Sequence, residues 1–175
     1  MKKTQEQIRA DKDTVMIALK KYGNNIMEIA KQTGFSRQKV WRNIKRLEEE
    51  NIICGYTTVL NERKAGRRKF ILLVKRKCVP FAKGVNVFGG ISLEREAQLS
   101  RVTIDDIILT NGYYDVVFVI SANSIVAVNS FNESLCHLFK DEVDDIITLD
   151  GLYTLKQSGQ EVTPLEEVKH FYSLD

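Results

Sequence analysis

Residues 25–50 read NIMEIAKQTGFSRQKVWRNIKRLEEE, and this stretch decides how the first third of the chain folds. Asn25, with a glutamate three positions later, is a helix-start pattern in front of a short apolar stripe. Thr33-Gly34-Phe35-Ser36 supplies a glycine turn and a serine that can cap the next helix, which we expect to end near Glu50. Two short helices joined by a glycine turn predict a helix-turn-helix.

The second helix of this pair has two contrasting faces. At about 100° per residue, its predicted inward stripe holds Val40, Ile44, Leu47 and Asn51. Arginine and glutamine can form bidentate hydrogen bonds with base edges, whereas lysine and serine more naturally hold phosphate. Trp41 lies between the faces and is interpreted either as packing or as stacking on a nucleic acid. The expected DNA-binding residues are Ser36, Arg37, Gln38, Lys39, Arg42, Lys45 and Arg46.

The segments on either side complete the predicted DNA-binding domain, residues 1–60. A capping box of Thr4 and Gln7 opens a first helix that ends at Gly23. Residues 51–61 are rich in β-branched and aromatic side chains and are predicted to form a strand. A basic linker over residues 61–68 either touches phosphate or is solvated. A helix-turn-helix that docks proteins instead of DNA stays open as an alternative.

Charge is divided unevenly along the chain. Its net charge of +3 combines a net of +9 over residues 1–70 with a net of −6 over the remainder. Neutralising phosphates releases counterions and drives affinity for nucleic acid, so the basic part is the candidate for a polyanion. No apolar run approaches the roughly 18 residues of a membrane span, and no secretory signal is present. We therefore expect a soluble cytoplasmic protein without a membrane partner.

The acidic remainder, residues 69–175, shows the pattern of a ferredoxin-like α+β domain. Strands are predicted over residues 69–77, 107–110, 116–121 and 146–156, the last with a bulge at Asp150-Gly151. A helix is expected over residues 124–139, with Val128, Phe131, Leu135 and Leu138 inward. The connection from Cys78 to Ser100 is broken by proline and glycine, and only its end looks helical. The order βαββαβ is the split βαβ arrangement, and a carboxy-terminal tail follows.

The sequence contains no recognisable catalytic or metal-binding pattern. It lacks a glycine-rich phosphate loop, a GxSxG elbow and HExxH, and its three cysteines have no CxxC spacing. An acidic cluster over residues 141–145 is better interpreted as a solvated turn than as a cation site. We therefore expect no catalytic residue, metal or cofactor, and a protein that is not an enzyme.

Three stretches resemble the Lrp/AsnC (feast/famine) transcription regulators. They are IAKQTGFS at residues 29–36, RNIKRLE at residues 42–48 and ICGYTTVLN at residues 53–61, and Gly112-Tyr113-Tyr114-Asp115 resembles the family's effector loop. The resemblance implies a winged-type helix-turn-helix joined to a ferredoxin-like effector domain. It implies double-stranded DNA as partner, a homodimer or higher homo-oligomer, and a small effector such as an amino acid near Gly112, Tyr113, Tyr114 and Asp115.

Tyr113 stands where the family usually has aspartate, which favours a more apolar or aromatic ligand. The same loop has a plain structural interpretation, since hairpins use glycine and aspartate for turn geometry. Two other functions remain open. One is a tetrapyrrole-modifying enzyme of the sirohaem decarboxylase type, which shares this architecture, and the other is a ligand-binding assembly module without DNA binding.

Overall fold

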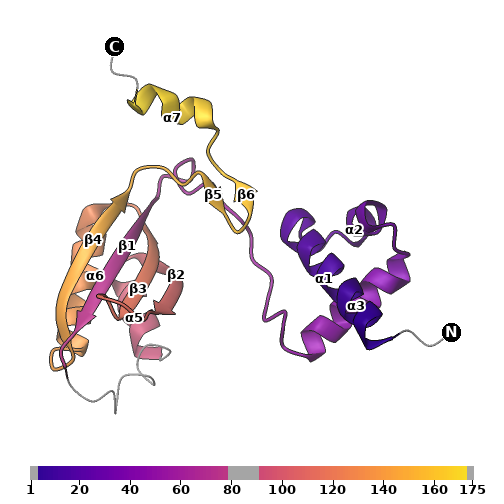
Figure 1. Cartoon of the computed structure of the whole chain (residues 1–175). Coiled ribbons are helices and arrows are strands. Elements are labelled where there is room, and N and C mark those ends of the chain that lie inside the picture. The colour runs from indigo at the N-terminus through magenta and orange to yellow at the C-terminus, as the bar shows by residue number, and fades with distance from the viewer. Residues whose placement is uncertain (1–3, 79–90, 173–175) are drawn as a thin grey trace. The chain divides into compact units, whose positions relative to one another are not determined.

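The computed structural model describes residues 4–78 and 91–172, which fall into two compact units (Figure 1). Unit 1 comprises Met1–Val59 together with Leu155–Pro164, and unit 2 comprises Leu60–Thr154 together with Leu165–Asp175. The expected division placed all of residues 69–175 in one domain. Residues 155–164 instead make their contacts with the amino-terminal unit, so unit 1 is built from two separate parts of the chain.

Unit 1 contains three helices and a small hairpin. The helices are α1 (Gln5–Tyr22), α2 (Ile26–Thr33) and α3 (Arg37–Glu49), and the hairpin strands are β5 (Lys156–Gln157) and β6 (Gln160–Glu161). Each helix begins where the sequence predicts, because Thr4, Asn25 and Ser36 each accept a hydrogen bond from a backbone N–H of the first turn. The helices enclose a core of Val15, Ala18, Ile29, Ala30, Val40, Ile44 and Leu47.

The strand predicted over residues 51–61 is wrong. Residues 53–60 form no strand, although their β-branched content favours one. A strand needs ladder hydrogen bonds from a neighbour, and no described segment of this chain pairs with these residues. Asn51, expected on the inward stripe, is exposed and has a φ of 53°, so it ends α3 instead of continuing it.

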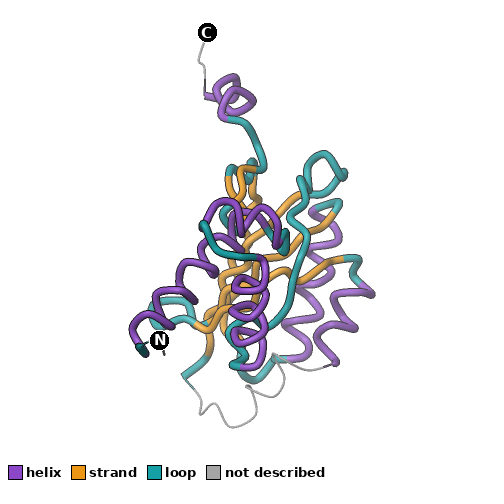
Figure 2. Tube along the Cα trace, turned by 90° about the vertical axis from the view of Figure 1, so that its right-hand side faces the viewer, coloured by secondary structure: helices purple, strands orange, loops and turns teal. Residues whose placement is uncertain are grey.

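Unit 2 is an antiparallel four-stranded sheet with the ferredoxin-like order β2-β3-β1-β4. Its elements are β1 (Arg68–Arg76), α5 (Ile91–Leu99), β2 (Val102–Leu109), β3 (Val116–Ala122), α6 (Ile125–Leu138), β4 (Val143–Gly151) and α7 (Leu165–Tyr172). Helices α5 and α6 lie together on one side of the sheet (Figure 2), and their apolar side chains share a core with Phe70, Leu72, Phe118 and Ile120. The predicted fold class is confirmed.

Several local expectations in unit 2 need correction. The second strand begins at Val102, five residues before its predicted start. A register shift between Ile104 and Asp106 interrupts the alternation of apolar and polar residues, so the sequence pattern does not reveal the first part of this strand. Leu138 is 37% exposed and Phe139, 3% exposed, fills the core at the end of α6. The predicted bulge at Asp150-Gly151 is a strand end instead. The glycine-broken part of the first connection, residues 79–90, lies outside the described residues.

The basic segment 61–68 is part of unit 2. The guanidinium of Arg67 donates to Thr103 Oγ1 at 2.7 Å and to the backbone oxygen of Ser121 at 2.8 Å. Its Nε lies 3.1 Å from a carboxylate oxygen of Glu62. These contacts hold the start of β1 against β2 and β3. Arg67, one of the basic residues of the predicted linker, therefore stabilises the sheet.

Candidate functional site

Helix α3 presents its polar face outward from unit 1. Its buried side is formed by Val40, Ile44 and Leu47, all less than 5% exposed, so the opposite side faces solvent. The exposed residues there include Gln38, Arg42, Lys45 and Arg46, and Arg37 is exposed in the first turn of the helix, so α3 exposes five of the seven predicted DNA-binding residues. Side chains of this kind on one exposed helix face can reach base edges and phosphates.

Ser36 and Lys39 have structural roles in this conformation. The Ser36 hydroxyl accepts a hydrogen bond from the backbone N–H of Lys39 at 3.2 Å and caps α3. Lys39 is half-buried, with its Nζ 2.6 Å from Asp11 Oδ1 on α1, and its ammonium lies over the ring of Phe35. Both residues therefore help to set the position of α3, and neither is presented as freely as Gln38.

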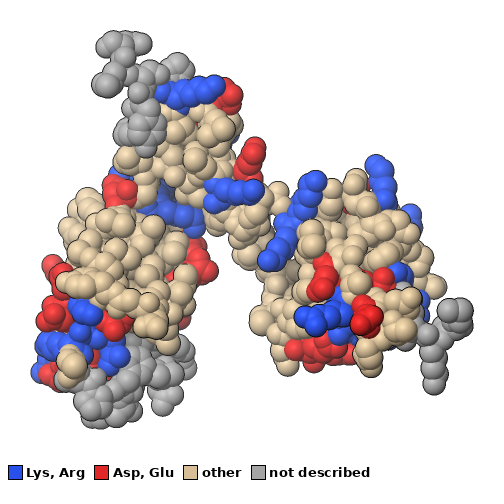
Figure 3. Space-filling view, in the orientation of Figure 1, with Lys and Arg blue, Asp and Glu red and all other residues tan. Residues whose placement is uncertain are grey.

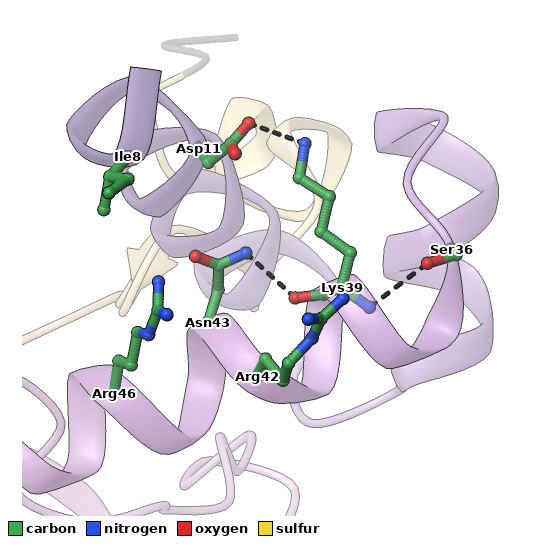
Figure 4. Close-up of a pocket in the computed structure, with 7 residues that line it drawn as sticks. All are labelled: Ile8, Asp11, Ser36, Lys39, Arg42, Asn43 and Arg46. Carbon is green, nitrogen blue, oxygen red and sulfur yellow. Dashed lines mark hydrogen bonds and ion pairs between the residues drawn. The ribbon is translucent and has the colours of Figure 1, made fainter. Parts of the chain in front are cut away.

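A hollow of about 530 Å³ lies between α1 and α3. Figure 4 shows Lys39 reaching across to Asp11, with Arg42 and Arg46 projecting from later turns of α3. The hollow thus combines three cationic side chains with a single carboxylate. The exposed face of α3 that carries Gln38, Arg42 and Lys45 is called the reading face. A cationic surface beside this face fits a phosphate of a nucleic-acid backbone better than a neutral ligand.

Asn43 is a functional neighbour that the sequence reasoning missed. It is only 5% exposed, and its Nδ2 donates to the backbone oxygen of Lys39 at 2.9 Å. Its position on the helical wheel, about 40° from Leu47 at the edge of the apolar stripe, is the signal that could have placed it inward. A buried asparagine that bonds its own helix fixes the turn from which Lys39 projects.

The carboxy-terminal half of α3 carries a small polar network. Lys45 Nζ lies 3.0 Å from Glu48 Oε2, and the Tyr56 hydroxyl donates to Glu48 Oε1 at 2.9 Å. The hydrogen bonds from Lys45 and Tyr56 lower the pKa of Glu48. Burial, followed by the bond to Glu48, raises the pKa of Tyr56. The predicted phosphate contact Lys45 is therefore already paired, and DNA would have to compete with Glu48 for it.

Trp41 is 52% exposed and stands on the outer flank of α3. It is not a member of the apolar core of unit 1. Packing in this core therefore does not explain Trp41, and stacking on a nucleic acid stays the open interpretation.

Unit 1 carries both signs of charge on its surface. Figure 3 shows lysine and arginine side chains along the upper margin of this unit, with acidic side chains gathered on the lower part of the same face. Part of the acidic set is consumed by ion pairs, since Lys12 bonds Glu50 and Lys39 bonds Asp11. Exposed cations of α3, including Arg37 and Arg42, lie outside these two ion pairs.

The predicted effector loop lies between β2 and β3. The carboxylate of Asp115 accepts from the backbone N–H of Arg76 at 2.8 Å, and Lys75 Nζ lies 3.6 Å from it. The Arg76 N–H, aided by the charge of Lys75, lowers the pKa of Asp115 despite an opposing effect of burial. The Thr110 N–H donates to the Asp115 backbone oxygen and closes the hairpin, and the Asp115 N–H donates to the backbone oxygen of Val74 on β1. Asp115 thus already has structural partners.

The rest of this loop is open to solvent. Tyr113 is 75% exposed, meets Tyr114 edge to face at 5.0 Å between ring centroids, and has the Lys75 ammonium 5.0 Å from its ring centre. Nothing lies within 4 Å of the position that a Cβ on Gly112 would take. Together, Gly112, Tyr113 and Tyr114 form an exposed aromatic surface beside a fixed carboxylate.

The described residues provide neither a metal-binding cluster nor a membrane-spanning helix. Residues 4–78 and 91–172 contain no group of three or more histidine, cysteine and acidic side chains able to hold a metal ion. No helix within these ranges is long and apolar enough to cross a bilayer. The three cysteines are exposed and free of disulfide bonds.

The fold and the α3 face define a two-domain protein with a helix-turn-helix and a ferredoxin-like sheet. Residues 19–53 match a winged helix-turn-helix DNA-binding family. No curated protein sequence matches the chain.

Several solved structures share the whole fold. An AsnC family transcriptional regulator from Agrobacterium tumefaciens matches with a TM-score of 0.59 at 17% identity, over 90% of this chain and 97% of its own. LrpC of Bacillus subtilis matches with a TM-score of 0.56 at 18% identity, over 89% and 99%. A feast or famine regulatory protein from M. tuberculosis, complexed with L-methionine, matches with a TM-score of 0.62 at 13% identity, over 88% and 98%. The chain therefore has the fold of the Lrp/AsnC regulators.

Proposed function

We propose that this protein is a sequence-specific DNA-binding transcriptional regulator of the Lrp/AsnC type, and not an enzyme, acting in the cytoplasm. The observation that carries the proposal is the outer face of α3, where Gln38 and Arg42 are exposed one turn apart beside Lys45. These residue types at this spacing can read base edges and hold phosphate. The strands flanking Gly112 contain no histidine or arginine, which the tetrapyrrole-modifying alternative would need.

Selection of bound duplexes from a random pool, followed by anisotropy titrations, tests this proposal. Arg42→Ala and Gln38→Ala should each relax discrimination at one base pair by about 1–3 kcal/mol, if the contact is bidentate. Lys45→Ala should weaken binding to all sequences and reduce the salt slope by at most about one, because Glu48 competes with phosphate for the exposed Lys45 ammonium. Arg95→Ala, which removes an exposed cation from α5, is the matched control and should change neither property. Equal, sequence-independent losses for Gln38, Arg42 and Lys45 would contradict this reading face.

We further propose that the protein works as a homodimer formed through unit 2. Helices cover one face of the sheet, whereas the other face carries half-exposed apolar residues, namely Ile71, Leu73, Val117, Val119, Ile147 and Leu149. A second copy offers the same apolar face, and a single recognition helix reads too few base pairs for useful affinity. Ile147→Asp should convert a dimer into a monomer in light scattering. Leu99→Asp, on the exposed side of α5, should leave the dimer intact, and a wild-type monomer at micromolar concentration would refute the proposal.

A small metabolite is the proposed effector, with its site near Gly112, Tyr113, Tyr114 and Asp115. Support comes from the exposed aromatic pair and from the L-methionine named with the M. tuberculosis structure of this fold. Thermal-shift screening of amino acids on the native protein and on Tyr113→Ala tests it, because Tyr113 is exposed and its removal should not disturb the fold. Asp115→Ala is a second variant, but it also removes the acceptor for Arg76. A ligand that stabilises native and Tyr113→Ala protein equally would place the site elsewhere.

A further inference from the structure

The hairpin of β5 and β6 follows unit 2 in the chain but is built into unit 1. Its two central residues, Ser158 and Gly159, have φ values of 49° and 83°, as a two-residue type I′ turn requires. Lys156 pairs with Glu161 and Gln157 pairs with Gln160, and the N–H of Val162 closes the base by donating to Leu155 at 3.0 Å. This is a defined element with a fixed register.

The side chain of Gln160 in the hairpin contacts the carboxy-terminal end of α1. Gln160 Nε2 donates to the backbone oxygens of Lys20 and Lys21, both at 2.9 Å. The last four carbonyls of a helix have no partner within it, and Gly23 N–H satisfies only Leu19 in this last turn. Gln160 therefore supplies two of the missing donors.

Helix α1 in turn positions the recognition helix. Its Asp11 bonds Lys39 near the start of α3, and its Lys12 bonds Glu50 at the end of α3. Val15 and Ala18 of α1 are buried in the same core as the inward stripe of α3. A rotation or shift of α1 would consequently move both ends of α3.

We propose that Gln160 is a positioning residue for DNA binding, acting through α1 on the reading face of α3. The proposal rests on the proposed function as a DNA-binding regulator. A residue from the carboxy-terminal part of the chain thereby sets how the amino-terminal helices are held, and residues 155–164 are a working part of the DNA-binding unit.

The full-length chain offers a matched set of variants. Gln160→Glu keeps nearly the same shape, removes the donor and adds a negative charge beside the carboxy-terminal end of a helix, where it is unfavourable. Gln160→Lys restores a donor and adds a favourable charge. Glu161→Gln alters the exposed neighbour and is the control. Trp41, the only tryptophan of the chain, lies on α3 and reports its surroundings directly.

Three measurements distinguish a Gln160 that only caps α1 from a Gln160 that also positions α3. In Gln160→Glu, hydrogen exchange in the last turn of α1 should rise about fivefold or more, as expected for losing two hydrogen bonds. Acrylamide quenching of Trp41 should change, and the Kd for a selected duplex should rise by about three- to tenfold on the same grounds. Gln160→Lys and Glu161→Gln should match the native protein in all three.

Two results would overturn the proposal. Unchanged exchange in α1 would mean that the hairpin is not seated there. Faster exchange with unchanged Trp41 quenching and unchanged Kd would reduce Gln160 to a local cap. Absence of any DNA binding by the native protein would refute the proposed function instead, and exchange and Trp41 quenching would still decide whether Gln160 controls the position of α3.

Discussion

The ion pair between Lys39 and Asp11 allows a direct test of what Lys39 does. The sequence marks Lys39 as a DNA-binding residue, whereas the structure places its Nζ 2.6 Å from Asp11 Oδ1. The two side chains are 25% and 16% exposed, so the pair is neither a surface pair nor a fully buried one. Lys39→Met removes the ammonium that pairs with Asp11 and lies over the Phe35 ring, and it keeps a long flexible side chain.

The magnitude follows from this intermediate burial. Exposed pairs contribute about 0.2–1 kcal/mol, and breaking a buried pair costs about 3–5 kcal/mol because a charge is left without its partner. Lys39→Met should therefore lower the free energy of unfolding by about 2 kcal/mol. Asp11→Asn should cost less, because Asn can still accept a hydrogen bond. The double variant should show a coupling of about 1–2 kcal/mol.

Urea unfolding of the native protein, the two single variants and the double variant, followed by circular dichroism, measures this coupling. Titration of a DNA duplex at several salt concentrations measures the contribution of Lys39 to binding. We expect the salt slope of Lys39→Met to equal that of the native protein. The reasoning is refuted if Lys39→Met leaves stability unchanged and reduces the salt slope by about one, since Lys39 would then hold a phosphate.

Two further predictions concern unit 2. A Cβ on Gly151 would lie 2.6 Å from the backbone oxygen of Lys69, so Gly151→Ala should cost about 1–3 kcal/mol in urea unfolding, while Gly112→Ala, in open space, should change it by less than about 0.5 kcal/mol. Equal effects would contradict the close approach. The pKa of Asp115 is lowered, so its charged form stabilises the native state at neutral pH, and this contribution is lost as pH falls through the lowered pKa. Asp115→Asn should therefore melt below the native protein at pH 7, with a difference that shrinks below about pH 4; a difference independent of pH would exclude the charge as its cause.

The helices of unit 1 are readable from sequence because their signals are local. Thr4, Asn25 and Ser36 cap the helices that follow them, and each side chain accepts from the backbone N–H three residues further on. Apolar spacing then orients α3 correctly, since burial of Val40, Ile44 and Leu47 follows from the helical period alone.

The misses arise where structure depends on partners distant in sequence. Residues 53–60 have strand composition but no partner strand within residues 4–78 and 91–172, and composition does not reveal whether a partner strand exists. The start of β2 at Val102 was hidden because Asp105 and Asp106 interrupt its alternation at the register shift. Asp105 is tied to Lys69 and Ser121 across the sheet, which no local pattern shows.

In the candidate site, too, local features follow from the sequence and contacts between distant residues do not. The sequence predicts which side of α3 faces outward, and exposure of Gln38 and Arg42 follows from it. It does not predict that Lys39 and Lys45 already have carboxylate partners, because Asp11 lies 28 residues away and Glu48 competes from the next turn. A list of basic residues therefore overstates the charge that is free to meet DNA.

The separation between Gln160 and its acceptors, 140 residues to Lys20, has a consequence for biosynthesis. A chain emerges from the ribosome at about 5–20 residues per second, so the helices of unit 1 exist for roughly 7–28 seconds before Gln160 is synthesised. During that interval the last turn of α1 has two carbonyls bonded only to water, and residues 60–154 of unit 2 are made. Unit 1 thus starts to fold before most of unit 2 exists and is completed only afterwards, and a ribosome that stops before residue 160 releases a helix-turn-helix without its final hairpin.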